Sequence, residues 1–190
     1  MRIDTLDTLV SLNMIKSGMN VLDVGCGPGN WAVDFIERGY KLNYIGIDNQ
    51  VACKKVFEEK VTDPSYKFIT IDAQAAYYNW MGKMLSKDVV FPIEDDWADL
   101  VVCHSLFTHL GKFANSKNYI SEIKRILKSG AYLWITFFQS PPNLVDNSIR
   151  RTVYSCEQIG EIMDGFDIFY KNGGDTDGYN DQLMIGARKL

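Results

Sequence analysis

The sequence predicts an α/β fold with a doubly wound, mostly parallel sheet of seven strands and helices on both faces. Three observations predict it. Short apolar runs alternate with segments that carry apolar residues at helical spacing, giving five such units in succession. The run at 131–138 is apolar throughout, as expected for a strand covered on both faces. The runs at 166–171 and 182–188 have no helix between them and therefore predict an antiparallel C-terminal strand pair.

The remaining elements follow in order along the chain. Strands are expected at residues 20–25, 42–47, 66–71 and 98–103, and helices at 30–38, 50–60, 74–86, 117–128 and 155–164. Gly39 and Gly130 stand where the C-terminal caps of two of these helices belong. Residues 1–19 are expected to form an N-terminal helical segment, and the aromatic-rich stretch 73–92 is a candidate lid inserted before the fourth long strand.

Length and composition limit the classes of function. The 190 residues fit a single domain spanning 1–190. Acidic residues outnumber basic ones by 24 to 20, which argues against a nucleic-acid partner bound through a broad basic face. No apolar run approaches the roughly 18 residues needed to cross a membrane, so no membrane partner is expected. The four cysteines form no CxxC pair, which predicts reduced thiols, no zinc site and a cytoplasmic location. The oligomeric state stays open.

The strongest local signal is the glycine-rich sequence DVGCGPGN at residues 23–30, which follows a strand and opens a helix. Asp48 ends the second strand, where a carboxylate can accept both hydroxyls of a ribose. Asp72 ends the third strand and can accept from the exocyclic amine of an adenine. Each acid taken alone is better explained as a helix N-cap. Together with Asp23, they lie at the ends of three successive strands and predict an adenosine site.

With these residues considered together, the chain resembles the class I S-adenosylmethionine-dependent methyltransferases, in their small-molecule branch. The sequence VLDVGCGPG resembles that family's first motif, Asp48 its second and Asp72 its third. The stretches FPIEDDWADLVVCHSLFTHL and ISEIKRILKSGAYLWITFF resemble the fourth and fifth motifs. The resemblance covers about residues 20–140. It implies a Rossmann-like methyltransferase fold, with S-adenosyl-L-methionine as cofactor and S-adenosyl-L-homocysteine as product.

The resemblance also implies a set of cofactor-binding residues. These are Asp23, Gly25, Cys26, Gly27, Gly29, Asp48, Asn49, Asp72, Ala73 and His104. The chain departs from the family at 128–131, where Lys-Ser-Gly-Ala replaces the frequent Lys-Pro-Gly-Gly in a turn remote from the chemistry. The Asp-Pro-Pro-Tyr signature of nucleic-acid amino-methyltransferases is absent after the fourth strand. The Ser-Pro-Pro-Asn sequence at 140–143 follows the fifth strand instead, where it is expected to end the strand.

Methyl transfer from a sulfonium is an in-line displacement, so the protein positions the acceptor and can remove its proton. His104 and His109 both follow the fourth strand, and an imidazole titrates near neutrality. Either histidine could instead cap a helix or bond to the backbone; His109 is slightly favoured as the base. The candidate substrate-contacting residues are Tyr78, Trp80, Phe107, Phe138 and Arg150. The aromatic stretch could equally pack on the sheet, and an exposed arginine needs no function.

The leading hypothesis is transfer of a methyl group to a small-molecule acceptor, with a hydroxyl oxygen as the favoured atom. The chain carries little beyond the catalytic core that could recognise a macromolecule. The alternative is a non-catalytic S-adenosylmethionine-binding subunit or sensor. A nicotinamide oxidoreductase is disfavoured, because Asn30 takes the place of the third glycine that packs helix on strand in that fold. No metal site is expected, since Asp95, Asp96 and Asp99 are interpreted as solvated loop positions.

Overall fold

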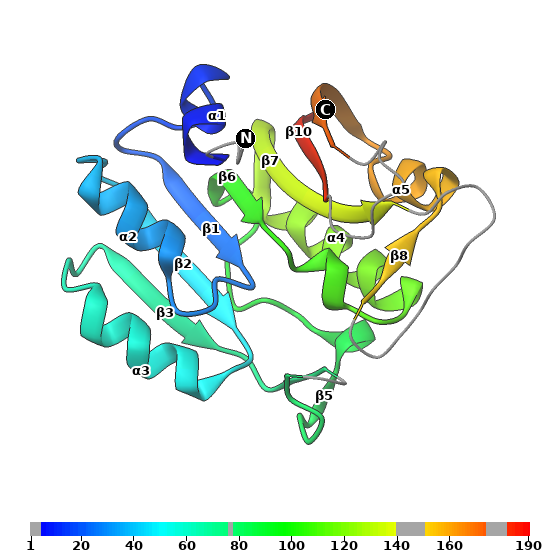
Figure 1. The fold of residues 1–190 in the computed structure, drawn as a ribbon, viewed down its shortest axis with the longest axis horizontal. Helices are drawn as coiled ribbons and strands as arrows, with labels where there is room; N and C mark the ends of the chain where they lie inside the picture. The colour runs from blue at the N-terminus through cyan, green and yellow to red at the C-terminus, as the bar shows by residue number, and fades with distance from the viewer. Residues whose placement is uncertain (1–4, 76–77, 140–150, 174–181) are drawn as a thin grey trace.

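The computed structural model describes residues 5–75, 78–139, 151–173 and 182–190. A central sheet carries helices on both sides (Figure 1), with the strand order β3-β2-β1-β6-β7-β10-β9. The parallel strands are β1 (Asn20–Val24), β2 (Asn43–Asp48), β3 (Tyr66–Thr70), β6 (Ala98–Cys103) and β7 (Leu127–Gln139). β9 (Phe166–Asn172) and β10 (Leu183–Lys189) form the expected antiparallel pair. A short additional strand, β8 (Val153–Tyr154), pairs with the end of β7. The predicted fold class is confirmed.

The helices form two layers because successive strand residues point to opposite faces. On one face lie α1 (Thr5–Ser11), α2 (Asn30–Glu37) and α3 (Val51–Lys60), and on the other α4 (Phe113–Ile126) and α5 (Cys156–Ile162). In β1, Val21 packs in the α2 layer and Leu22 in the α4 layer, and both are fully buried. In β7, Trp134 packs in the α2 layer and Leu133 in the α4 layer. Burial on both faces explains why apolar residues predominate in both strands, with Asp23 as a buried acid in β1.

The two expected glycine caps have different outcomes. Gly39 has φ 80° and ends α2, with the N–H groups of Gly39 and Tyr40 donating to the carbonyls of Ile36 and Phe35 at 2.9 and 3.0 Å. Gly130 is not a cap, because α4 ends four residues earlier and β7 begins at Leu127. Its positive φ of 76° lies inside the strand, near the point where the register between β6 and β7 shifts.

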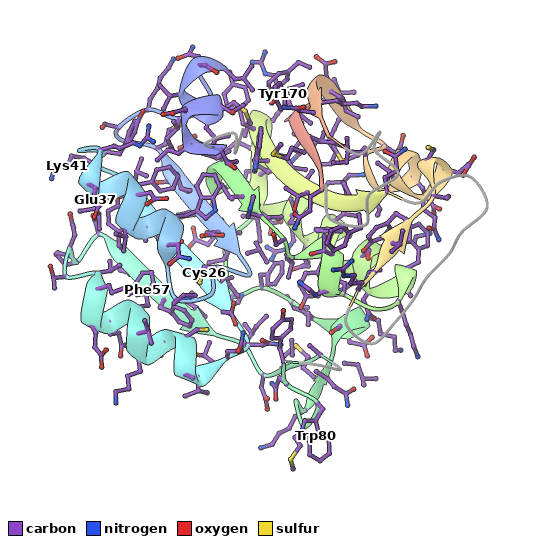
Figure 2. All side chains as sticks on the ribbon, in the orientation of Figure 1. Cys26, Glu37, Lys41, Phe57, Trp80 and Tyr170 are labelled. Carbon is purple, nitrogen blue, oxygen red and sulfur yellow. The ribbon has the colours of Figure 1, made fainter. Side chains whose placement is uncertain are left out.

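The helix predicted at 74–86 is wrong for the described residues of that segment. β4 (Ala73–Gln74) pairs with β5 (Met84–Leu85), and a 3-10 turn (Ser86–Asp88) follows. Trp80 and Met81 are 70% and 72% exposed, so these apolar residues do not form a buried helical face. A Cβ on Gly82 would lie 2.6 Å from the backbone nitrogen of Gln74, which shows how tightly this short lobe is folded. The Trp80 side chain projects from the edge of the molecule (Figure 2).

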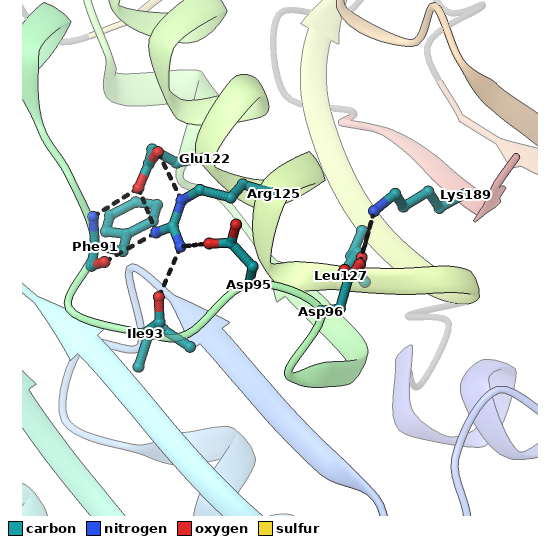
Figure 3. Close-up of polar contacts among 8 residues, drawn as sticks. All are labelled: Phe91, Ile93, Asp95, Asp96, Glu122, Arg125, Leu127 and Lys189. Atoms are coloured by element: carbon teal, nitrogen blue, oxygen red, sulfur yellow. Dashed lines mark hydrogen bonds and ion pairs between the residues drawn. The ribbon is translucent and has the colours of Figure 1, made fainter.

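An arginine network joins the end of this lobe to α4 (Figure 3). Arg125 donates to both carboxylate oxygens of Glu122, at 3.0 and 2.7 Å, and to Asp95 at 2.6 Å. It also donates to the carbonyls of Phe91 and Ile93, at 3.0 and 2.8 Å. Because five acceptors converge on one rigid guanidinium, residues 91–95 are fixed against the helix.

The three acids expected to be solvated loop positions are ion-paired. Asp95 pairs with Arg125 and Asp96 with Lys189, but both carboxylates remain largely exposed. Asp99 does not lie in a loop: it belongs to β6, accepts from the backbone N–H of Asn20 at 2.8 Å and pairs with Lys128 at 2.6 Å. The loop assignment was wrong for Asp99, because the strand expected at 98–103 is present and includes it. Within the described residues, no His, Cys, Asp or Glu cluster has the arrangement of a metal site.

Candidate active site

The glycine-rich loop turns the chain from the end of β1 into α2. Gly25 has φ 77°, and a Cβ on it would lie 3.1 Å from Cδ1 of Leu106. Gly29 has φ 82°, and a Cβ there would lie 2.3 Å from Cδ2 of Phe57. Both positions therefore need glycine for backbone conformation, and Gly29 also needs it for space. The first brings the loop against the segment that follows β6, and the second packs α2 against α3.

The amide groups of this loop are used within the protein. The N–H groups of Gly25 and Cys26 both donate to the carbonyl of Ile47, at 2.8 and 3.1 Å. The N–H of Gly27 donates to Oδ2 of Asp48 at 2.9 Å, and that of Gly29 to the carbonyl of Cys26 at 3.1 Å. A phosphate-binding loop presents such N–H groups to its anion. The amides of Gly25, Cys26, Gly27 and Gly29 are not available in this way, which disfavours an anion seated on the loop glycines.

A cavity of about 240 Å³, here called the Asp48 cavity, lies beside the loop. Its lining includes five predicted site residues besides the loop glycines: Asp48, Asn49, Tyr78, His104 and His109. Oδ1 of Asp48 accepts from the N–H of Gln50 at 2.9 Å, and Oδ2 accepts from Gly27. Each carboxylate oxygen can accept a second hydrogen bond. Asp48 is thus held rigidly and keeps acceptor capacity for the hydroxyls of a ligand.

A second cavity of about 660 Å³, here called the Asp23 cavity, lies on the other side of the loop. Asp23 is 1% exposed and accepts from the hydroxyl of Tyr44 at 2.6 Å. Burial raises the pKa of Asp23 to about 7; the Tyr44 hydrogen bond opposes this rise and the charge of Asp48 adds to it. Asp34 also lines the cavity. Two carboxyl groups make this cavity suited to a cationic group.

His104 lies where the two cavities meet, since it lines both together with Gly25 and Gly27. Its Nδ1 is buried and has no hydrogen-bond partner in the described parts of the chain. Burial lowers the pKa of His104, which keeps its imidazole neutral at neutral pH. The ring packs 5.8 Å from that of Trp31, centroid to centroid. A ligand bound where the two cavities meet could supply the hydrogen bond that this buried nitrogen lacks.

The residue after His104 is held in a strained conformation. Ser105 has φ 59°, its N–H donates to Oγ1 of Thr136 at 2.7 Å, and its hydroxyl lies 3.1 Å from Oε1 of Gln182. Backbone strain of this kind persists where neighbouring contacts over-determine it, often beside a site. His109 lies further along the Asp48 cavity, with its ring edge-to-face on Tyr78 at 5.2 Å.

Other predicted residues lie outside the two cavity linings. Gly29, Asp72, Ala73, Trp80, Phe107 and Phe138 line neither cavity. Asp72 is exposed and accepts from Nδ2 of Asn79 at 3.2 Å, whereas Phe107 is fully buried with its ring 5.4 Å from Phe137. Arg150 lies outside the described residues.

Several lining residues were not identified from the sequence. They include Trp31, Asp34, Ser86, Leu106 and Tyr119. Trp31 and Asp34 lie in the first turns of α2, directly after the glycine loop, and this position is a signal that could have found them. Ser86, Leu106 and Tyr119 converge only through tertiary packing, so no local pattern marks them.

Comparisons with known proteins identify the family. The family model described as "Methyltransferase domain" matches residues 22–135. A SAM-dependent methyltransferase from Methanosarcina mazei superposes with a TM-score of 0.70 at 18% identity, over 95% of this chain and 97% of that one. Magnesium protoporphyrin IX methyltransferase from Synechocystis PCC 6803, solved with bound SAM, gives 0.64 at 17% identity, over 98% and 77%. The [4+2]-cyclase SpnF gives 0.68 at 17% identity, over 98% and 80%.

The chain therefore belongs to the methyltransferase domain family, with the class I S-adenosylmethionine-dependent fold. S-adenosylmethionine is the cofactor of this class and S-adenosylhomocysteine its product. The residues of the two cavities fit such a molecule. Asp48 offers acceptors to a ribose, and the carboxyl groups of the Asp23 cavity suit the ammonium group of the amino-acid end.

Proposed function

We propose that this chain transfers the methyl group of S-adenosylmethionine to a hydroxyl oxygen of a small-molecule acceptor. The observation that carries the proposal is the position of His104, whose buried Nδ1 lacks a described partner where the Asp48 and Asp23 cavities meet. Asp48 and Asn49 would hold the ribose, and Asp23 the amino group. Asp72 and Ala73 would contact the adenine edge. The carbonyl of Ala73 accepts from Nδ2 of Asn49 at 3.2 Å, so Ala73 lies beside a residue that lines the Asp48 cavity.

When bound, the cofactor supplies a methyl group that is already activated on a sulfonium. The chain then has to orient the acceptor and take its proton. A neutral imidazole with a lowered pKa is ready to accept that proton, and we assign the role to Nδ1 of His104. Ser105 and Thr136 fix the backbone that carries the ring. His109 is the alternative base, from the Tyr78 side of the Asp48 cavity.

The test is a turnover screen over small hydroxylated and amine acceptors, reading formation of S-adenosylhomocysteine. H104Q is expected to lower kcat by about 10²-fold or more and to remove the acidic limb of the pH profile, which should lie below the ordinary histidine value. H109Q is the matched control. If H109Q loses the acidic limb and H104Q keeps it, the assignment of the base is wrong. The Asp48→Ala blank should bind S-adenosylhomocysteine more weakly by ~1–3 kcal/mol.

A second candidate function is a non-catalytic S-adenosylmethionine-binding subunit or sensor. The observation beside it is that SpnF, which is similar in fold, is named as a [4+2]-cyclase, so the fold is not confined to proteins that are named as methyltransferases. Tight binding of S-adenosylhomocysteine with no turnover of any hydroxylated or amine acceptor would support this candidate. Loss of that binding in Asp48→Ala would still identify the cofactor site, so the two functions are distinguishable.

We also propose a cytoplasmic location and no nucleic-acid partner. The formal charge of −4 supports a small-molecule acceptor over a polyanion. The four cysteines are unpaired, which suits a reducing compartment. In the described ranges, none of the helices has the length and apolar character needed to cross a bilayer.

A further inference from the structure

The short lobe after β3 ends in a cluster of exposed apolar side chains. We call residues 78–90 the tip. Its exposed members are Tyr78 (40%), Trp80 (70%), Met81 (72%), Met84 (37%), Leu85 (47%) and Val90 (64%). Among the described residues, ten large apolar side chains are exposed, and these six fall within thirteen consecutive positions. Scattered exposed apolar residues are normal, but a concentrated group of them marks an interaction surface.

The charge of the tip is opposite to that of the whole chain. Lys83 and Lys87 are exposed, and the one acid among these residues, Asp88, lies 3.6 Å from Nζ of Lys87. The tip therefore carries a net charge of about +1 in a chain of net charge −4. At physiological ionic strength, charges more than about 8 Å apart are largely screened. A surface that touches the tip therefore meets two lysines beside the apolar groups. Asp72, an exposed acid outside the tip, accepts from Nδ2 of Asn79 at 3.2 Å and opposes part of this positive charge.

Three backbone N–H groups of the tip, those of Asn79, Gly82 and Met84, are paired within the lobe. Ala75 and Asn79 exchange two backbone hydrogen bonds, at 2.9 and 3.0 Å. The N–H of Gly82 donates to the carbonyl of Asn79 at 3.1 Å, and that of Met84 to the carbonyl of Asp72 at 3.0 Å. An unpaired amide costs free energy when it leaves water. Because these amides already have partners, the apolar side chains can leave water without exposing them to that cost.

We propose that the tip docks on the surface of a bilayer that contains anionic lipid, as a peripheral contact. Tryptophan favours the membrane–water interface, and lysines near an anionic bilayer add attraction. A second copy of the chain is a poorer occupant, because a two-fold interface centred on the tip would oppose the Lys83 and Lys87 side chains of both copies. The expectation of no membrane partner rested on the absence of a spanning segment, and this peripheral contact goes beyond it.

The contact would place the lipid surface next to the Asp48 cavity. Tyr78 and Ser86 belong to the tip and also line that cavity. Tyr78 thus joins the exposed apolar cluster to the ring of His109. The docking proposal does not depend on methyl transfer, since binding to vesicles is measured without cofactor or acceptor.

The experiment is co-sedimentation of the full chain with vesicles of phosphatidylcholine alone or with about a quarter phosphatidylglycerol. We expect binding to the anionic vesicles that weakens with salt, and a blue shift of the tryptophan emission that W80S/M81S lacks. The double variant W80S/M81S should reduce binding roughly tenfold or more. K83Q/K87Q should reduce binding by about 25-fold, because each lysine contributes about fivefold. L190S is the matched control, because Leu190 is 75% exposed at the other end of the sequence.

Three results would overturn the proposal. The first is no sedimentation with either vesicle. The second is equal loss of binding in L190S and W80S/M81S. The third is a concentration-dependent dimer in analytical ultracentrifugation that W80S/M81S converts to monomer, which would assign the tip to a second copy. Unchanged binding of S-adenosylhomocysteine by W80S/M81S verifies that the variant is folded.

Discussion

The two sides of the Asp48 cavity are built in different ways. On one side, Asp48 is 8% exposed and is hydrogen-bonded to the glycine loop, at the end of a strand buried on both faces. On the other side, Tyr78 is 40% exposed and belongs to a short lobe outside the main sheet. The first side is over-determined by the core. The second can change its side chains without disturbing the core, which is where variation in acceptor is expected to arise.

The lobe is itself divided into a fixed base and an exposed tip. At the base, Arg125 holds the carbonyls of Phe91 and Ile93 and the carboxylate of Glu122 (Figure 3). At the tip, Trp80 projects into solvent (Figure 2). We call the glycine-rich loop (residues 23–30) and Asp48 the strand-end wall. The loss of stability on substitution should therefore be largest in the strand-end wall, smaller at the base of the lobe and almost zero at the tip. Three predictions follow this order.

The largest effect concerns the pH dependence of stability due to Asp23. Its pKa is about 7 in the folded chain and 3.8 in the ordinary carboxyl. Between these values the folded state holds a proton that the unfolded state has released, so the free energy of unfolding falls as pH rises from about 4 to 7. A shift of roughly three pH units corresponds to about 4 kcal/mol. Asp23→Asn should lack this decline, as measured by urea unfolding across that range.

The comparison with Asp23→Asn is needed because other groups also titrate. Burial lowers the pKa of His104, which gives a dependence of opposite sign, and both proteins share it. It therefore cancels in the difference between the two curves. Parallel curves for the two proteins would show that Asp23 is ionised in the folded state at acidic pH, and the physical account of the Asp23 cavity would be wrong.

The strand-end wall could be predicted from the sequence because its signals are local. A strand, a glycine-rich turn and a helix follow one another in residues 20–37, and Asp48 is the last residue of the next strand. The parallel sheet then brings these strand ends together without further information. Even the Gly39 cap depends on residues within one turn of it. The hydrogen-bonding of the loop amides was not predictable, since it requires the position of Ile47.

The lobe could not be predicted in the same way. Residues 74–86 contain aromatic and apolar side chains that imitate a helical pattern, but the described ones are exposed and the fold is set by pairing of Ala73 with Met84. The start of α4 at Phe113, four residues early, and its end before Leu127 also depend on tertiary contacts. Leu127 is as buried in a strand as it would be in a helix, so burial pattern alone could not decide between them.

The second prediction isolates packing from backbone strain in the strand-end wall. Gly29→Ala places a methyl group on Phe57 at a φ of 82° and should cost about 3 kcal/mol, part strain and part overpacking. Gly39→Ala has the same backbone problem, with φ 80°, but a Cβ there meets nothing within 4 Å. It should cost about 1 kcal/mol. Urea unfolding measures both, and equal losses would mean that α3 yields to the extra methyl group.

The smallest effect separates the base of the lobe from its tip. Burial raises the pKa of Glu122, but hydrogen bonds from Arg125 and Phe91 outweigh it and leave that pKa below its ordinary value. Arg125→Met keeps the apolar stem and leaves this half-buried carboxylate without its guanidinium, at a cost of about 2 kcal/mol. Trp80→Ser, the matched change at the exposed tip, should stay within about 0.5 kcal/mol of the parent in free energy of unfolding.

Thermal unfolding measures both variants, and a loss of stability in Trp80→Ser as large as in Arg125→Met would show that the tip supports the fold. The tip's apolar surface would then have a structural explanation, and the contrast drawn between the two parts of the lobe would fail.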